Sequence, residues 1–331
     1  MKKTHYLTLF TALLLISCQE PGSLKSNITG SLGEVMIVMG DNTKTSPGGK
    51  YLCEMFTQEM TGLPQIESLF NISVIPPNAL SDAMKLFRNL VIVTISPDIE
   101  QDEVKYITQN AWARDQALMF IEAKNLENFR EMIEQNETRI LSFFISAERK
   151  RILNFHTKNS NSELMQLVHT NMGFNMVVPG SFRANKPQSG VNFKWYSNET
   201  PTFSEGLLIY TFDYNDENCL SKDNLIFKRD SALKVNIPGS FDGSYMATET
   251  DIPISYKTLT VHGHETVELR GLWKTVGDFM GGPFVQFAHL DRKNNRVIVT
   301  DGYVYAPQKQ NKRNHVWQVE ALLYSVRFDT E

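Results

Sequence analysis

Two histidines and a glutamate in the second half of the chain have the spacing that best suits a metal site. On a β-strand, His262, His264 and Glu268 would point to one face. Two imidazoles and a carboxylate are typical ligands of a divalent metal. Gly263, between the histidines, favours a turn that would break this common face. We therefore expect exposed histidines near a hairpin turn, and the sequence predicts neither a metal site nor a cofactor.

Three carboxylates, Asp242, Glu249 and Asp251, would suit hydrolysis of a glycan. Glycosidases pair a carboxylic acid with a carboxylate about 5 to 10 Å away. The chain has neither a Gly-x-Ser-x-Gly nor a His-Glu-x-x-His motif, the strong local signatures of other hydrolases. A non-catalytic binding or assembly protein is therefore favoured. A hydrolase that acts on glycan or peptidoglycan through carboxylates of the second half is the alternative.

A third group could form a ligand or partner surface. Aromatic residues beside the Gly281-Gly282-Pro283 turn offer a large contact area, and arginines add directional donors for a carboxylate or a sugar. The same aromatic residues could instead pack in the core. The group comprises Arg270, Trp273, Tyr303, Tyr305 and Arg313.

Composition limits the class of protein. The 331 residues include 33 basic and 37 acidic side chains, a net charge of −4, without a basic block. Nucleic-acid binding depends on neutralising phosphates, so no nucleic-acid partner is expected. The length allows two domains, and the absence of an apolar run of about 18 residues excludes a multi-spanning membrane protein.

The amino terminus has the features of an export signal. Lys2 and Lys3 precede an apolar stretch of about a dozen residues, which is short for a spanning helix. The stretch ends in Leu15-Ile16-Ser17-Cys18, which resembles the lipobox of bacterial lipoproteins. This resemblance implies cleavage before Cys18, a diacylglycerol on its sulfur and a fatty acid on its new amino group. Residues 1–17 would then be a signal peptide and residues 18–31 a flexible tether.

The residues after Cys18 indicate to which membrane the protein is attached. Lipoproteins retained in the inner membrane typically have an Asp directly after the lipidated cysteine, where this chain has Gln19. Lipoproteins exported to the cell surface typically have a run of acidic residues there, whereas Glu20 is a single acidic residue. We expect attachment to the outer membrane through the lipid, on its periplasmic face, with the cell surface or the inner membrane as alternatives. The partner there would be an envelope protein or a glycan.

Strands alternate with helices in residues 32–156. Apolar or β-branched runs predict strands at 33–40, 66–75, 90–95 and 117–123, and helical spacing predicts helices at 51–60, 79–87, about 98–113 and 126–155. The Gly40–Lys50 loop is expected to cap a helix rather than to bind an anion. This half therefore reads as an α/β domain.

Short strands dominate residues 157–331. A helix is predicted from Ser160 to Gly173, strands at 174–178, 193–197, 207–214, 245–249, 258–261 and 266–273, and a hairpin across Asn294-Asn295. An amphipathic helix over 316–326 ends the chain. This half reads as α+β with a mainly antiparallel sheet and a C-terminal helix.

Several short motifs are spread over the chain: Arg270-Gly-Leu-Trp273, Met280-Gly-Gly-Pro-Phe284, Tyr303-Val-Tyr-Ala-Pro307 and Lys312-Arg313, together with Gly33-Glu-Val, Leu63-Pro-Gln65, Phe87-Arg-Asn-Leu90, Glu148-Arg149 and Trp195. At these residues the chain resembles a family of envelope lipoproteins described only as domain of unknown function 4837. The resemblance would cover nearly the whole mature chain. The resemblance implies a location in the cell envelope and a shared architecture. It implies no activity, because none is assigned to the family.

Two features concern covalent chemistry. With Cys18 acylated, Cys53 and Cys219 remain, and their places on an early helix and in the later half favour two thiols over a disulfide. Asp230-Ser231-Ala232 resembles the sequon that some Gram-negative bacteria use for O-glycosylation, which would make Ser231 the acceptor.

The lipobox generates the first testable prediction. Metabolic labelling with a fatty-acid analogue should mark the wild-type protein and should not mark a Cys18→Ala variant, because the thiol is the acceptor of the lipid. Label on the variant, or wild-type protein recovered free of membranes, would contradict lipidation.

Overall fold

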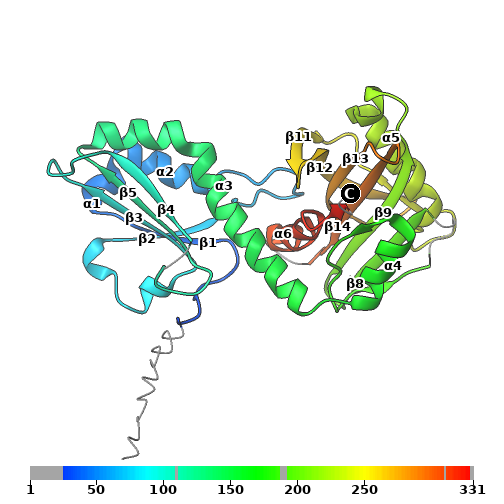
Figure 1. Ribbon diagram of the computed structural model, residues 1–331, viewed down its shortest axis with the longest axis horizontal. Helices are drawn as coiled ribbons and strands as arrows, with labels where there is room; N and C mark the ends of the chain where they lie inside the picture. The colour runs from blue at the N-terminus through cyan, green and yellow to red at the C-terminus, as the bar shows by residue number, and fades with distance from the viewer. Residues whose placement is uncertain (1–24, 109–110, 187–191, 309–310, 329–331) are drawn as a thin grey trace, which may run out of the picture.

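The computed structural model of the protein describes residues 25–108, 111–186, 192–308 and 311–328. Two β-sheets, one from each half of the chain, lie on either side of a long helix that joins them (Figure 1). This confirms an α/β part followed by an α+β part with a mainly antiparallel sheet and a C-terminal helix. Cys18 and the predicted leader lie outside the described residues.

The first sheet has five strands in the order β2-β1-β3-β5-β4. They are β1 (Glu34–Val38), β2 (Asn71–Ile75), β3 (Asn89–Ile95), β4 (Glu103–Ile107) and β5 (Ala117–Ala123). β4 is antiparallel to β5, and the other pairs are parallel. The apolar runs of β1, β3 and β5 occupy the three central positions, where both faces of a strand are buried.

Two helices predicted in this half are wrong. The segment at 79–87 contains the 3₁₀ turn η2 (Met84–Leu86) and overlaps the end of another, η1 (Pro77–Ala79), because a helix of nine residues is too short to be stable by itself. The segment at about 98–113 contains β4 instead of a helix. Its Val104 and Tyr106 alternate with polar residues, and this period of two lets it pair with the edge of β5.

Among the described residues of the first half, three α-helices form: α1 (Asp41–Thr45), α2 (Pro47–Thr57) and α3 (Leu126–Lys158). The Gly40–Lys50 loop contains the start of both short helices, and Ser46 caps α2 by accepting a hydrogen bond from the Gly49 amide at 3.1 Å. The expected cap at the start of this helix is thus confirmed, and the segment expected as a loop before it contains helix α1 instead.

Helix α3 continues past the first sheet to the second half. Asn125 caps its start by accepting from the Glu127 and Asn128 amides. Its early turns bury Phe129 and Ile133 against the first sheet, and its later turns pack on the C-terminal helix. The rings of Phe70, from the first half, and Trp317, from the second, lie 5.2 Å apart in one continuous apolar core.

The second sheet has eight antiparallel strands in the order β10-β12-β13-β14-β9-β8-β7, with β11 paired to β12 as well. They are β7 (Arg183–Ala184), β8 (Phe193–Glu199), β9 (Ser204–Asp213), β10 (Tyr245–Thr248), β11 (Ser255–Val261), β12 (His264–Val276), β13 (Gly281–Asp291) and β14 (Arg296–Tyr305). Asn295 turns the predicted hairpin at φ +50°. The strand expected at 174–178 is shorter: β6 (Phe174–Asn175) pairs with β15 (Arg327–Phe328).

Helices cover both faces of this sheet. α4 (Ser162–Met172) and η3 (Glu217–Leu220) lie at its margins, α6 (Lys312–Leu323) packs on β13 and β14, and α5 (Lys222–Asn236) packs on the opposite face. α5 was not predicted from the sequence, because its buried stripe contains Arg229 between Leu225 and Leu233. Arg229 is fully buried and donates to Asp301 at 2.7 Å. None of the described helices has the length and apolar character needed to cross a bilayer.

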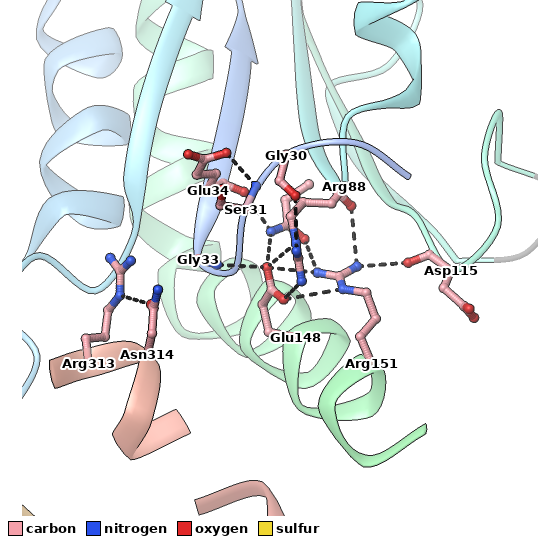
Figure 2. Close-up of polar contacts among 11 residues, drawn as sticks. Gly30, Ser31, Gly33, Glu34, Arg88, Asp115, Glu148, Arg151, Arg313 and Asn314 are labelled. Atoms are coloured by element: carbon pink, nitrogen blue, oxygen red, sulfur yellow. Dashed lines mark hydrogen bonds and ion pairs between the residues drawn. The ribbon is translucent and has the colours of Figure 1, made fainter. Parts of the chain in front are cut away.

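A buried carboxylate joins α3 to the first sheet (Figure 2). Glu148 is 1% exposed and accepts hydrogen bonds from the Gly33 amide at 3.2 Å and from Asn89 at 2.7 Å. It also forms ion pairs with Arg88 and Arg151. Since Gly33 precedes β1 and Asn89 begins β3, this one side chain fixes the starts of two central strands.

The second half is attached through the first turn of α6. Glu67, from the first half, accepts from the backbone amides of Lys312 at 2.8 Å and Arg313 at 3.1 Å, so it supplies the cap that Asn311 does not. Arg313 is 2% exposed and donates to the carbonyl of Ser68 at 2.8 Å. Gly33 has a φ of +76°, which favours glycine, and a Cβ there would also lie 2.9 Å from the Arg313 guanidinium.

The Glu148 contacts predict a large change in stability. Glu148→Gln should lower the free energy of unfolding by about 3 kcal/mol, because it leaves two largely buried guanidinium groups without their carboxylate. Glu131→Gln, an exposed glutamate on the same helix, should change it by less than about 0.5 kcal/mol. Urea unfolding measures both, and equal effects would contradict this role of Glu148.

A second stability prediction concerns His289, which is fully buried near the C-terminal end of β13. Its Nδ1 lies 3.0 Å from the hydroxyl of Thr266, and burial, with a smaller contribution from His264, lowers its pKa to about 3. An unfolded chain binds this proton below about pH 6.5, whereas the folded chain stays neutral down to about pH 3. The contribution of neutral His289 to stability is therefore complete above pH 6.5 and is lost progressively below it.

We expect the wild-type protein to lose about 2 kcal/mol more stability than His289→Gln between pH 8 and pH 5, from a slope of about 1.4 kcal/mol per pH unit. Chemical unfolding at both pH values gives this difference. Parallel pH profiles for the two proteins would show that His289 is not kept neutral in the folded state.

Candidate functional site

A cleft of about 580 Å³ lies between the two halves, beside the middle of α3. The loop between α2 and β2 and helix α3 form the walls from the first half. Strands β11 and β12, helix α6 and Tyr324 form the walls from the second half. The α2–β2 loop reaches far across the molecule: a Cβ on Gly62 would lie 3.2 Å from Arg270. The cleft therefore exists only where both halves meet.

Ion pairs form the floor of this cleft. The Nη2 atom of Arg270 lies 2.8 Å from Glu268 and 2.7 Å from Glu320. Arg149, on α3, lies 3.6 Å from the same Glu320, and its guanidinium stacks 3.3 Å from the Tyr324 ring centre. Side chains two apart on a strand share a face, which is why Glu268 lies beside Arg270 on the face of β12 from which Arg270 reaches Glu320 on α6.

Burial and pairing fix the charges of this floor. Burial alone would raise the pKa of Glu268, but Arg270 outweighs it and holds that pKa below its usual value. Burial alone would lower the pKa of Arg270, and the two carboxylates raise it well above the usual value. Burial raises the pKa of Tyr324 to about 12. Glu268 and Arg270 are charged at neutral pH, so they can orient a ligand and are poorly suited to exchange protons with it.

Of the residues expected to form an aromatic and arginine surface, the structure brings the aromatic ones together: the Trp273 ring lies 5.8 Å from that of Tyr303 and 6.1 Å from that of Tyr305. Trp273 and Tyr303 are less than 5% exposed, and the Tyr303 hydroxyl accepts from Trp195 at 3.0 Å. Tyr305 is half-buried beside Trp273, and Arg313 is buried at the junction of the halves. Burial in the core, the alternative left open by the sequence, is what the structure shows for Trp273 and Tyr303. Arg270 lines the cleft.

The three candidate metal ligands, His262, His264 and Glu268, each contact a different partner. His262, at φ +50°, and Gly263 form the hairpin turn between β11 and β12. The Nε2 atom of His262 bonds to the Tyr324 carbonyl at 2.8 Å, the His264 ring packs on Phe328, and Glu268 pairs with Arg270. Within the described ranges no three His, Cys, Asp or Glu residues form a metal-binding group.

The candidate hydrolytic carboxylates lie outside the cleft. Glu249 accepts from the Asp251 amide and from Lys274, each at 3.1 Å, and these contacts lower its pKa. Asp242 is exposed in the turn before β10. Glu249 is thus ionised at neutral pH and cannot serve as the protonated acid that glycoside hydrolysis requires.

The covalent candidates have clear positions. Cys53, half-buried on α2, and Cys219, buried in η3, are both free thiols, as favoured from their places in the chain. Ser231 is exposed in the middle of α5, where its hydroxyl donates to the Phe227 carbonyl at 2.7 Å. It borders an apolar groove of about 640 Å³ between α5 and strands β8 and β9.

Sequence reasoning did not identify Glu320 or Tyr324 as site residues. A signal for Glu320 was present, because it is four residues after Val316 and three before Leu323 and so falls within the apolar stripe of α6. A charged residue on a buried helix face requires a partner, which is Arg270. No comparable signal marked Tyr324, which lies just after the helix.

Similarity to solved structures is weak. The Ran-binding protein Mog1p of Saccharomyces cerevisiae is 12% identical over 47% of this chain and 89% of its own, with a TM-score of 0.32. A protein from Bacteroides thetaiotaomicron VPI-5482 is 13% identical over 49% of this chain and 47% of its own, with a TM-score of 0.21. No curated protein matches the chain.

Two family models match the chain and meet near the end of α3. Residues 28–156 match the model described as "Domain of unknown function (DUF8532)". The motifs from Gly33-Glu-Val to Glu148-Arg149 fall in this range, so the expectation that one family spans nearly the whole mature chain is corrected. The remaining motifs fall in a second match, and residues 161–325 of this chain belong to the family described as "Domain of unknown function (DUF4837)".

Proposed function

We propose that this protein is a lipid-anchored lipoprotein of the bacterial envelope that binds a partner without catalysis, in the cleft between its two halves. The lipobox-like sequence at Cys18 supports the anchor, and Gln19 with the isolated Glu20 supports the periplasmic face of the outer membrane. The body begins at the first half, where Asn27 and Thr29 bridge to Arg114 and Phe87. Residues 25–31, expected as the end of the tether, are thus bound to the first half.

The cleft is the observation that carries this proposal. Its volume of about 580 Å³ is within the range of about 300 to 1,000 Å³ typical of ligand sites. Exposed hydroxyl groups of Thr138, on α3, and Thr258, on β11, line opposite walls. A ligand between them would contact both halves at once, and the ion-paired floor would orient it.

The charges of the cleft favour a polypeptide partner. Four acidic and three basic side chains line it, and Glu59 and Lys257 are exposed at its edge. A polypeptide segment presents charges of both signs and can complement this mixture, whereas a neutral glycan presents none. An extended segment of another envelope protein is therefore the partner we propose.

The fixed protonation states favour binding over hydrolysis. A glycosidase requires one carboxyl group that stays protonated near neutral pH, usually because burial raises its pKa. In this cleft Arg270 lowers the pKa of Glu268 instead. The arrangement therefore gives no support to the hydrolase alternative.

Cross-linking in intact cells tests this proposal. A photoreactive residue placed at Thr138 and, separately, at Thr258 should give adducts with the same partner, because the two positions face each other across the cleft. Lys44, equally exposed but on α1, is the control and should give no such adduct. Adducts with this partner from position 44, or different partners from the two walls, would contradict binding in the cleft.

A further inference from the structure

A second cavity, of about 510 Å³, lies on the other side of Arg149 and differs from the cleft in charge. We call it the basic pocket. Its charged lining residues are Arg149, Lys150 and Arg327, and none of its lining residues is acidic. The cleft, by contrast, is lined by Glu59, Glu137, Glu268 and Glu320 as well as by cations.

Four segments that are distant in the sequence form the basic pocket. One stripe of α3 supplies Arg149, Lys150 and Leu153, whose spacing keeps them on one side of the helix. Strand β15 supplies Arg327, which is held opposite Asn175 of β6. The turn before β12 supplies His262, whose Nε2 donates to the Tyr324 carbonyl at 2.8 Å. Backbone pairing and this hydrogen bond fix the pocket before any ligand enters.

The cations of the pocket are only partly neutralised. Arg149 has one distant carboxylate partner, Glu320 at 3.6 Å. Lys150 and Arg327 are exposed, and neither takes part in an ion pair with any residue in the described part of the chain. Three positive groups around one cavity generate a positive potential that a bound anion would relieve.

The floor of the pocket is apolar. Leu153, Met165 and Val177 line it, and Met176 beneath them is buried. An inorganic anion would contact only the cationic edge, whereas an anion attached to an apolar body would also cover these side chains. The lining thus has the two parts that recognise an amphiphile.

We propose that the basic pocket binds an amphiphilic anion, with a phosphate or carboxylate group against Lys150, Arg327 and Arg149 and an apolar body over Leu153, Met165 and Val177. Two sources share this chemistry: a soluble organic anion and the headgroup region of an anionic phospholipid. This inference goes beyond the function proposed for the cleft and does not depend on it, because the two cavities share only Ser146, Arg149 and Tyr324.

Calorimetric titration of 1-naphthyl phosphate into residues 19–331, a chain that retains every described residue, tests the pocket. We expect saturable binding, with 1-naphthol and inorganic phosphate each at least about tenfold weaker, because each lacks one of the two parts. Lys150→Met and Arg327→Met should each weaken binding about tenfold, while Lys158→Met, an exposed lysine of the same helix outside the pocket, should not.

Each outcome has a defined meaning. Lack of binding by the wild-type chain, binding unchanged in the Lys150→Met Arg327→Met double variant, or equal binding of inorganic phosphate would overturn the proposal. Because both side chains are exposed, thermal unfolding should show that the variants remain folded.

Vesicles of phosphatidylcholine with and without phosphatidylglycerol distinguish the two sources of the anion. Retention only on the anionic vesicles, lost in the double variant, identifies the lipid headgroup, and titration without retention identifies the soluble anion; either result supports the pocket.

The proposals for the two cavities fail separately. Loss of naphthyl phosphate binding leaves the cross-links from Thr138 and Thr258 unaffected, and loss of those cross-links leaves the titration unaffected.

Discussion

The position of α3 depends on the burial of one charge, the carboxylate of Glu148. Arg88, Asn89, Arg151 and the Gly33 amide surround it, and together they fix the rotation of α3 against the first sheet. Because the rotation of α3 is set, the directions in which Arg149 and Lys150 point are set as well. Arg149 lies between the two cavities and Lys150 lines the basic pocket. A charge buried for structural reasons thus determines where two neighbouring charges become accessible.

The same helix makes the two halves mechanically one unit. Their apolar cores are continuous through the contact of Phe70 with Trp317, and Glu67 of the first half caps α6 of the second. Large relative motion of the halves would break this cap and expose that core. The cleft is therefore largely preformed, which reduces the entropy that a ligand must lose on binding.

The two cavities illustrate how pairing changes the use of a charge. In the cleft, Arg270 lies between two carboxylates, so its charge is compensated and serves to hold β12 and α6 together. In the basic pocket, Lys150 and Arg327 have no such compensation, and their charge is available to an anion. Similar residue types therefore support orientation of a polar partner in one cavity and attraction of an anion in the other.

The sequence by itself determined the fold class, most strands and the long helix, because apolar period and turn residues are local properties. Residues 117–123, 126–155 and the Asn294-Asn295 hairpin are examples. It did not determine α5, since Arg229 interrupts the apolar stripe and is stabilised there by Asp301, 72 residues away, and by Thr248. The lipobox-like sequence is also a local property and can be recognised as a motif. Lipidation of Cys18 stays a prediction.

Only the tertiary structure decided the site. Trp273 and Tyr303 have the composition of a binding surface, yet the packing of the second sheet buries them, whereas Arg270 on the same sheet faces Glu320 and the cleft. Arg149, Lys150 and Arg327 form a pocket because α3 and β15 meet, a contact between residues about 180 positions apart. Periodicity specifies which face of an element a residue occupies, but the partner of that face depends on how distant segments pack.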